Sequence, residues 1–572
     1  MARRANRNGG SRARHSAPAR KAADEKSSGP SLLRRRGVQA ATIFLLLLCA
    51  YLANGDILPG NDATGNVRLA GNLVTHHRLV FTPEAEPYLF EWVLKTPEGE
   101  QNARFRGWQS QLNGEPIRRA FERGNLTHPA PPYFLMETRR RGVYANLYGV
   151  GAALVAVPFV AAAYAFAPDL YDRPSAGLLW QAAKVAAACA VAGSAVCLFL
   201  AALAFVRPGT AAWLAFAYGL GTCAWSTSSQ ALWQHGPMEL FLALGTLFLL
   251  REDRRRAAYG VGLCYAMAFA CRPTAAVAIV AAGGYYLLRD RRAFVRWAVG
   301  GLPVALALSA YNLHYFGKLV VLGQLGDAYQ AASAFLAFAV PAAMAAPVAL
   351  ASSSSRGVFG TSLLVGCSGI LLSPSRGLLV FSPVLVFTFW GLVRVWRDPR
   401  FSALRPVTLA AMGMCLLVAR WHGWWGGWCY GYRLLTDAVT LMAFLAIPVA
   451  EAIRRRRVLA ALLCLGLAWS VGVQVVGAFA YDVTGWNNRE LVAVKVPGEE
   501  KPRLYRDARE AGREARSRGG SVEEIRADVN RSQGNFRLWS IRDSQILYYL
   551  EHFFAARQLK RAAMEAFLRE RG

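Results

Sequence analysis

The sequence predicts an all-α polytopic membrane protein with about 11–13 transmembrane helices. Of the 572 residues, 54% are hydrophobic and the mean hydropathy is +0.24. Many separate apolar runs are long enough to cross a hydrocarbon core of roughly 30 Å, and clusters of Lys and Arg lie between them. Such clusters gather in cytoplasmic loops, so the formal net charge of +29 is explained without a nucleic-acid partner, and we predict none.

The chain begins with a basic segment. Residues 1–36 contain eleven Lys or Arg, only two Asp or Glu, and almost no apolar side chains. This composition predicts a disordered cytoplasmic tail. The first span is expected at 37–53 and opens a membrane domain that extends to residue 480.

A large first external loop is expected over about residues 55–142. It is rich in prolines and aromatic residues, and we expect two or three short interfacial helices in it. The next apolar run, 144–167, contains Gly149, Gly151 and Pro158. We interpret it as interfacial or re-entrant, because a full span there would place the basic cluster at 251–256 outside the cell.

The remaining apolar runs alternate across the membrane. The expected spans are 180–205, 211–226, 238–250, 260–271, 275–288, 299–313, 378–390, 408–418, 435–450 and 459–479, with an extra hairpin within 331–372. This topology places the arginine clusters in the cytoplasm and the C-terminal region outside the cell. Residues 481–572 carry helical patterns at 521–530 and 543–568, so we expect an external, mostly helical C-terminal domain.

Polar residues collect on the external side in this topology. An ionisable residue at membrane depth costs at least ~2.5–3.5 kcal/mol, so such residues usually line a cavity or pair with one another. The guanidinium fork of Arg matches phosphate oxygens. The candidate phosphate ligands are Arg433, Arg376, His235 and Arg272, and the candidate substrate contacts are Trp425, Tyr432, Tyr311 and Asn312.

Two carboxylates, Asp56 and Asp62, open the first external loop. An aspartate facing an anion-binding pocket can take a proton from an acceptor hydroxyl while arginines stabilise a departing phosphate. These residues predict transfer of a sugar from a lipid phosphate. We expect no cofactor beyond that co-substrate and no metal ligand, since His76 and His77 lack zinc-type spacing, although a divalent metal stays open.

Several motifs follow one another in an informative order. They are Trp233-Gln-His-Gly-Pro237, Cys271-Arg-Pro-Thr274, Tyr311-Asn-x-x-x-Phe-Gly317, Ser373-Pro-Ser-Arg-Gly377 and Trp425-Gly-Gly-x-Cys-Tyr-Gly-Tyr-Arg433. Over residues 38–480 the chain resembles the GT-C superfamily of membrane glycosyltransferases, which includes the protein O-mannosyltransferases and the lipid A aminoarabinose transferase.

The resemblance implies an inverting hexosyl- or pentosyltransferase of the bacterial inner membrane that uses a polyprenyl-phosphate sugar. Its acceptor would be a glycolipid, a glycan or a protein. The catalytic base would be Asp62, with Asp56 as the second candidate. The chain departs from the family where Tyr148-Gly-Val-Gly151 replaces the Tyr-x-Pro-Gly element and where a tandem acidic pair is missing.

Other interpretations stay open. Asp62 could be a turn residue, Asp56 a helix cap, and the arginines interfacial anchors. A transporter or flippase of a lipid-linked saccharide would also use an arginine-lined cavity, but it commonly shows paired repeats, which this sequence lacks. A scaffold with a partner-binding C-terminal region is a third hypothesis.

Overall fold

The computed structural model describes residues 30–57, 61–96, 99–104, 111–112, 115–116, 126–127, 134–167, 177–251, 254–319, 359–499, 503–505, 508–530 and 535–569. Within them, five helical segments are long and apolar enough to cross a membrane. They are Arg34–Leu52 in α2 (Pro30–Leu52), α6 (Gly177–Ala202), α11 (Arg291–Phe316), Pro399–Arg420 and α19 (Arg457–Ala480). The chain is therefore a multi-pass, largely α-helical membrane protein.

Shorter helices pack beside these five. They are α5 (Gly151–Phe166), α7 (Pro208–Gly221), α8 (His235–Leu249), α9 (Arg254–Cys271), α10 (Ala276–Arg289), α13 (Leu363–Leu372), α14 (Leu378–Phe381), α15 (Val386–Arg397), α17 (Thr436–Leu445) and α18 (Ile447–Arg455), while α16 (Arg405–Arg420) is the main part of the long segment Pro399–Arg420. The segment Arg433–Leu445 and α18 meet at a bend of 57° and together have the length of one span. The sequence predicts more transmembrane helices than these because each of its short apolar segments counts there as a separate span.

Most expected helices are present, with shifted ends. Helix α2 begins at Pro30, so residues 30–36, which were expected to belong to the disordered tail, are helical. The break at Arg272 is confirmed, because the 3-10 turn Pro273–Ala275 separates α9 from α10. Helix α5 begins only at Gly151 and has 16 residues, fewer than the roughly 20 that a full span needs, because Tyr144–Asn146 at the start of the apolar run form a strand instead. Residues 1–29 and most of the expected 331–372 hairpin lie outside the described residues.

The first loop differs from expectation. Its described residues contain one helix of more than one turn, α3 (Asn61–Thr75), and several short antiparallel strands, where two or three interfacial helices were expected. These are β1 (Val80–Phe81), β2 (Glu91–Thr96), β3 (Gly99–Arg104), β4 (Gln111–Leu112), β5 (Glu115–Pro116), β6 (Leu126–Thr127), β7 (Leu135–Glu137) and β8 (Tyr144–Asn146). Of the prolines in this loop, Pro87 begins a 3-10 turn and Pro116 lies in β5, whereas Pro129, Pro131 and Pro132 lie outside the described residues.

The C-terminal region contains a sheet that was not predicted. Strands β9 (Asn488–Lys495), β10 (Arg503–Tyr505) and β11 (Ser521–Asp528) pair antiparallel in the order β10-β9-β11, beside α20 (Ala508–Arg518). The prediction of a helix at 521–530 is wrong, because residues 521–528 form strand β11. The apolar residues of this segment have helical spacing, but pairing along the whole of β9 overrides that local pattern. Helices α21 (Gln545–Glu551) and α22 (Phe553–Arg569) follow.

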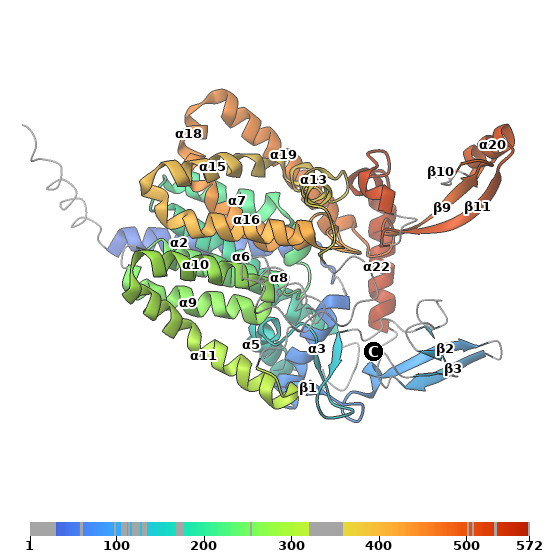
Figure 1. Ribbon diagram of the computed structural model, residues 1–572, viewed down its shortest axis with the longest axis horizontal. Helices are drawn as coiled ribbons and strands as arrows, with labels where there is room; N and C mark the ends of the chain where they lie inside the picture. Colours follow the sequence, from blue (N-terminus) through green and yellow to red (C-terminus); the bar gives the residue numbers. More distant parts are fainter. Residues whose placement is uncertain are drawn as a thin grey trace, which may run out of the picture.

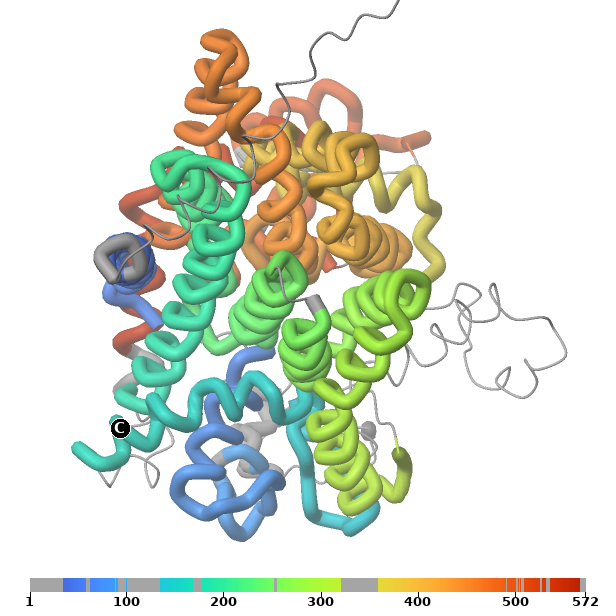
Figure 2. Tube along the Cα trace, turned by 90° about the vertical axis from the view of Figure 1, so that its left-hand side faces the viewer, coloured from blue at the N-terminus to red at the C-terminus, as the bar shows by residue number. Residues whose placement is uncertain are grey.

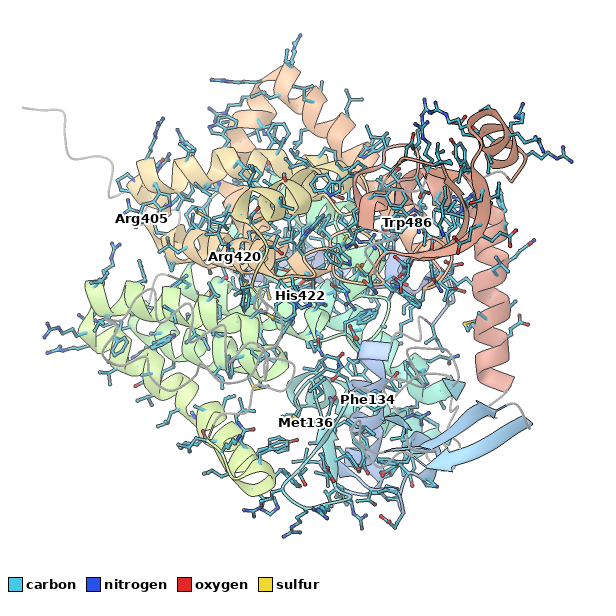
Figure 3. The ribbon with its side chains drawn as sticks, turned by 45° about the vertical axis from the view of Figure 1, so that its right-hand side comes forward. Phe134, Met136, Arg405, Arg420, His422 and Trp486 are labelled. Carbon is cyan, nitrogen blue, oxygen red and sulfur yellow. The ribbon has the colours of Figure 1, made fainter. Side chains whose placement is uncertain are left out.

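Figure 1 shows the long helices running roughly parallel, with α22 crossing one end of the bundle and the two strand hairpins projecting beyond it. In Figure 2, α2 lies beside α6. Figure 3 places Arg405 at one end of the molecule and Trp486 at the other, with His422 between them. Helix α16 thus leads from the end that carries Arg405 toward the middle, where His422 follows it.

A buried ion pair fixes α22 to the bundle. The Lys560 ammonium of α22 lies 3.2 Å from Asp56 Oδ2, and both side chains are less than 10% exposed. Lys560 also donates to the carbonyl of Ala478 at 3.0 Å, while Lys184 of α6 donates to the carbonyl of Asp56 and to Asn54. Burial lowers the pKa of Lys560, and Asp56 opposes that shift by favouring the charged form.

We expect Asp56→Ala to destabilise the protein by about 3–5 kcal/mol, because it leaves the buried Lys560 charge without its partner. Thermal unfolding in detergent measures the change. The matched control is Glu523→Ala, which removes an exposed ion pair with Lys495 and should have little effect. Equal melting temperatures for the two variants would contradict a structural role for Asp56.

Candidate active site

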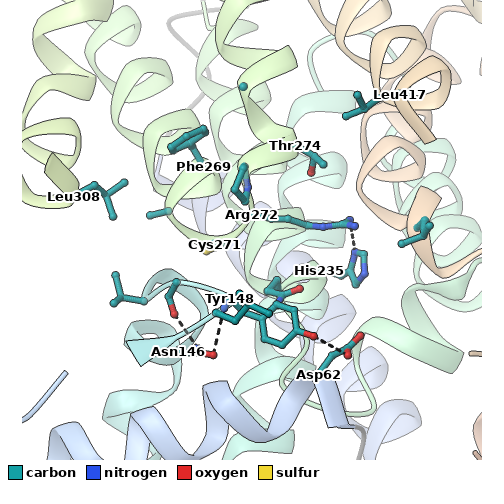
Figure 4. A pocket seen from close by; sticks show the side chains of 18 of the residues that line it. Asp62, Asn146, Tyr148, His235, Phe269, Cys271, Arg272, Thr274, Leu308 and Leu417 are labelled. Atoms are coloured by element: carbon teal, nitrogen blue, oxygen red, sulfur yellow. Dashed lines mark hydrogen bonds between the residues drawn. The ribbon is translucent and has the colours of Figure 1, made fainter. Parts of the chain in front are cut away.

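A cavity of about 880 Å³ lies where the first loop meets the helix bundle. Its lining includes seven of the ten residues predicted from the sequence: Asp62, His235, Arg272, Tyr311, Asn312, Trp425 and Arg433. Figure 4 shows Asp62, Tyr148, His235 and Arg272 around the cavity. The structure thus brings together residues that are separated by up to 371 positions in the chain.

Helix α3 positions Asp62 in its first turn. A carboxylate there interacts favourably with the positive end of the helix dipole. Ala63, Asn66, Val67 and Ala70 form one fully buried face at helical spacing, which holds the helix against the bundle. Asn66 donates to the carbonyl of Leu232 at 2.9 Å and accepts from Asn146 at 2.9 Å, so the orientation of α3 is fixed close to Asp62.

Both carboxylate oxygens of Asp62 are engaged. Oδ1 accepts a hydrogen bond from the Tyr148 hydroxyl at 2.8 Å, and Oδ2 accepts one from Arg433 Nη1 at 2.6 Å. The Asp62 side chain is 21% exposed and that of Arg433 is 13% exposed. The pair is therefore partly screened from solvent yet reachable from the cavity.

Arg433 is held by a glycine-rich loop. Its Nη2 donates to the carbonyl of Gly426 at 3.0 Å, and its guanidinium lies 4.8 Å from the centre of the Trp233 ring. Gly426 and Gly427 have φ of +79° and +71°, a left-handed conformation that favours glycine. The two glycines thus allow the turn whose carbonyl helps to orient the guanidinium.

A second charged cluster lines the same cavity. His235 Nδ1 is 3.1 Å from Asp437 Oδ1, 3.1 Å from Arg272 Nη1 and 3.0 Å from Thr436 Oγ1. Arg272 also donates to Asp437 Oδ2, and the Asp437 side chain is only 3% exposed. Asp437 therefore orients Arg272 and His235 while lying behind them. Within the described part of the chain, no three His, Cys, Asp or Glu side chains are grouped to hold a metal ion.

Three predicted residues are not brought to this cavity. Asp56 is 3% exposed and pairs with Lys560. Tyr432 is buried, and its hydroxyl contacts Ser382 Oγ at 2.6 Å and accepts from the Cys223 N–H at 3.2 Å.

Arg376 is the third residue outside the cavity. It is 1% exposed and lies 5.0 Å from the centre of the Trp486 ring. Its guanidinium donates to the carbonyl of Trp425 at 2.9 Å, to Gln545 Oε1 at 2.7 Å and to Asn487 Oδ1 at 2.9 Å. Arg376 therefore ties the 425–433 loop to the C-terminal region instead of facing a ligand.

A smaller cavity of about 260 Å³ shares Asp62 and Arg433 with the lining of the large cavity. Its lining includes Ser226, Thr227, Trp233, Trp428, Tyr430, Tyr481 and Asn530, in addition to Asp62 and Arg433. The Trp428 indole donates to Asp528 Oδ1 at 2.8 Å. Aromatic rings and hydroxyl groups dominate this wall, whereas the larger cavity is mostly apolar.

Sequence reasoning missed several of these residues. The sequence singles out Tyr148 only as part of Tyr148-Gly-Val-Gly151, and it does not single out Asp437 as a site residue. Asn530, which lies directly after β11 and lines both cavities, was assigned to a helix. No signal in the sequence places it near Trp425, because the contact spans 105 positions.

The amide of Asn530 has a defined orientation. Its Oδ1 accepts from the Trp425 indole at 3.0 Å, and an indole N–H can only donate. The NH₂ group is therefore the part of the side chain left to donate to a ligand.

We expect Asn530→Asp to weaken substrate binding by about two- to tenfold, since it removes one donor worth about 0.5–1.5 kcal/mol and keeps the acceptor for Trp425. Steady-state kinetics would show the loss as a raised KM. Ser517→Ala, on the remote helix α20, is the control. Unchanged kinetics in Asn530→Asp would remove this residue from the site.

Comparisons with known proteins give little further information. No protein-family model matches the chain, and neither does any curated protein. Among solved structures, the chain is similar to the crystal structure of ArnT from Cupriavidus metallidurans bound to undecaprenyl phosphate. The identity is 13%, the match covers 80% of this chain and 67% of that chain, and the TM-score is 0.42. That likeness is too distant for residues to be matched, so the function is inferred from the site itself.

Proposed function

We propose that this protein is a GT-C-like inverting glycosyltransferase, which moves a sugar from a polyprenyl-phosphate donor to a hydroxyl of a lipid, glycan or protein. One observation carries the proposal. Asp62 and Arg433 belong to the lining of both cavities, with Arg272 in the lining of the large cavity and aromatic and hydroxyl groups dominating the small one. A carboxylate in that position can act as a base between a phosphate-binding and a sugar-binding region.

The large cavity fits an amphipathic donor. Ile279, Val280, Val304, Leu308 and Leu417 supply apolar walls, and pockets of this size commonly combine such walls with a few polar groups. Arg272 and Arg433 both reach into the same space. A polyprenyl chain would lie against the apolar wall, with its phosphate between the two guanidinium groups.

The small cavity fits the sugar. Trp428 offers an aromatic surface, and Ser226, Thr227 and the Asn530 amide offer hydrogen-bonding groups. A ring with hydroxyl groups on its rim and C–H groups on its faces complements this combination. The anomeric carbon would then lie near Asp62, where the two cavities meet.

The reaction follows from this placement. Asp62 accepts the proton of the acceptor hydroxyl, and the resulting oxygen nucleophile forms a bond to the anomeric carbon. The bond from that carbon to the phosphate oxygen breaks, and the electron pair leaves with the polyprenyl phosphate. Arg433 and Arg272 stabilise the charge on the leaving group. Because a bound phosphate competes with Asp62 for Arg433, donor binding would also release the carboxylate to act as a base.

The charge distribution supports an external active site. The basic clusters at 251–256, 289–292 and 394–400 follow α8, α10 and α15, and Arg405 lies at the end of the molecule away from Trp486 (Figure 3). Such clusters mark the cytoplasmic side. We therefore propose that the site and residues 481–572 face the periplasm of a bacterial inner membrane and that the N-terminus is cytoplasmic.

The test is a transfer assay in proteoliposomes with a panel of radiolabelled polyprenyl-phosphate sugars, comparing wild type with Asp62→Asn. Transfer that depends on Asp62 is the expected result and identifies the donor. Movement of the labelled lipid across the bilayer without transfer would instead establish the flippase alternative.

A further inference from the structure

A short segment of the C-terminal region exposes three large apolar side chains. The 3-10 turn Asn535–Trp539 and the residues that follow it alternate between buried and exposed positions. Arg537 and Leu538 are 0% and 2% exposed, whereas Phe536, Trp539 and Ile541 are 44%, 45% and 72% exposed. The exposed set lies within six positions and faces away from the protein core.

This segment is firmly held. The Arg537 guanidinium lies 4.5 Å from the centre of the Trp486 ring, donates to Asp543 Oδ2 at 2.6 Å and donates to the carbonyl of Ala527 at 2.8 Å. Ser373, at the end of α13, donates to the carbonyl of Leu538 at 2.6 Å. The apolar side chains are therefore presented outward by a fixed backbone and not by a fraying loop.

The exposed set continues a surface that must face hydrocarbon. Helix α13 has no charged residue, and Leu363, Leu364, Val365 and Leu372 are 49%, 81%, 47% and 58% exposed. Such a helix is compatible with lipid and not with water. Trp424 packs over Gly369 of α13, where an added Cβ would come within 2.6 Å of the indole, and its ring centre lies 5.8 Å from that of Trp539. Figure 1 shows α13 beside the C-terminal segment.

The position of these side chains is typical of a membrane interface. Trp539 lies next to the C-terminal end of α13, because the carbonyl of the preceding residue, Leu538, accepts a hydrogen bond from Ser373. Tryptophan is enriched at the level of the lipid headgroups. Arg542 follows Ile541 in the chain and is exposed, so its charge can reach lipid phosphate groups while the neighbouring apolar side chains insert into the bilayer. A single exposed apolar residue needs no explanation, but a fixed set adjoining a lipid-facing helix does.

We propose that Phe536, Trp539 and Ile541 form an interfacial anchor, which inserts into the bilayer leaflet on the side of the candidate active site. The anchor holds the C-terminal region against the membrane. It thereby keeps Asn530, which precedes it in the chain, over the two cavities. The anchor does not depend on which reaction the site catalyses.

The test uses photocrosslinking of the full-length protein in nanodiscs. Ile541→p-benzoylphenylalanine is irradiated in nanodiscs made from phospholipids with clickable acyl chains, and lipid attached to the protein is quantified. Leu364→p-benzoylphenylalanine is the positive control, because that side chain is 81% exposed on α13. Val522→p-benzoylphenylalanine is the negative control, since Val522 is 47% exposed on the projecting strand β11.

We expect lipid labelling at Ile541 comparable to that at Leu364 and little at Val522. Labelling confined to Leu364, or equal labelling at Ile541 and Val522, would overturn the proposal. A crosslinked species of twice the protein's mass at Ile541 would show that a second copy of the chain covers the patch, and would equally overturn it.

Discussion

Asp62→Asn is expected to lower the rate of sugar transfer by about 10²–10⁴-fold, the usual contribution of a positioned general base. Asparagine has nearly the same shape, and its one side-chain oxygen can accept from Arg433 while its NH₂ group donates to the Tyr148 hydroxyl, which then has to accept that hydrogen bond. It cannot take the proton of the acceptor hydroxyl. The loss should therefore appear in kcat, measured with saturating donor, while the melting temperature stays close to that of wild type.

The control for this experiment is Asp398→Asn. Asp398 accepts from the Arg400 N–H at the start of a 3-10 turn, and asparagine is an equally good residue at such a position. That variant should retain wild-type turnover. If Asp62→Asn also turned over at the wild-type rate, Asp62 would be only a first-turn residue that stabilises α3, and the base would have to be sought elsewhere.

Hydropathy and charge were enough to predict the helical membrane domain, because both follow from the cost of placing polar groups in lipid. They were not enough to predict the C-terminal sheet. In the segment 521–530 the apolar residues Val522, Ile525 and Val529 have helical spacing, and only the pairing of β11 with β9, about thirty positions earlier, decides the conformation. Long-range pairing of this kind leaves little trace in the local sequence.

The same limit applies to the site. Asp62 was a candidate as a carboxylate at the opening of the first external loop, and Arg433 as an arginine beside a glycine-rich turn. Their direct contact, 371 positions apart, could not be read from the sequence. Arg376 had an equally promising setting in Ser373-Pro-Ser-Arg-Gly377, yet it lies under Trp486 and holds the 425–433 loop. A sequence shows that an arginine is unusual at membrane depth, but not whether it faces a ligand or the protein.

Arg433→Gln is expected to lower kcat/KM for the donor by about 10²–10³-fold, the effect of removing one preorganised group that stabilises developing negative charge. Glutamine retains a donor for the carbonyl of Gly426 but loses the positive charge and the planar fork that matches phosphate. Arg433→Lys should recover part of the activity, since the charge returns without the fork. Kinetics with donors of different chain length would separate loss of phosphate binding from loss of lipid binding.

Two other arginines make this prediction specific. Arg420 is exposed at the end of α16 and is not part of either cavity's lining, so Arg420→Gln should behave as wild type. Arg376→Gln should lower the melting temperature, because it removes the buried bonds to Gln545 and Asn487, and any loss of activity should follow that instability. If instead Arg376→Gln stayed folded and lost donor binding as severely as Arg433→Gln, the phosphate would have to lie on the opposite side of the 425–433 loop, and the large cavity would no longer be the donor site.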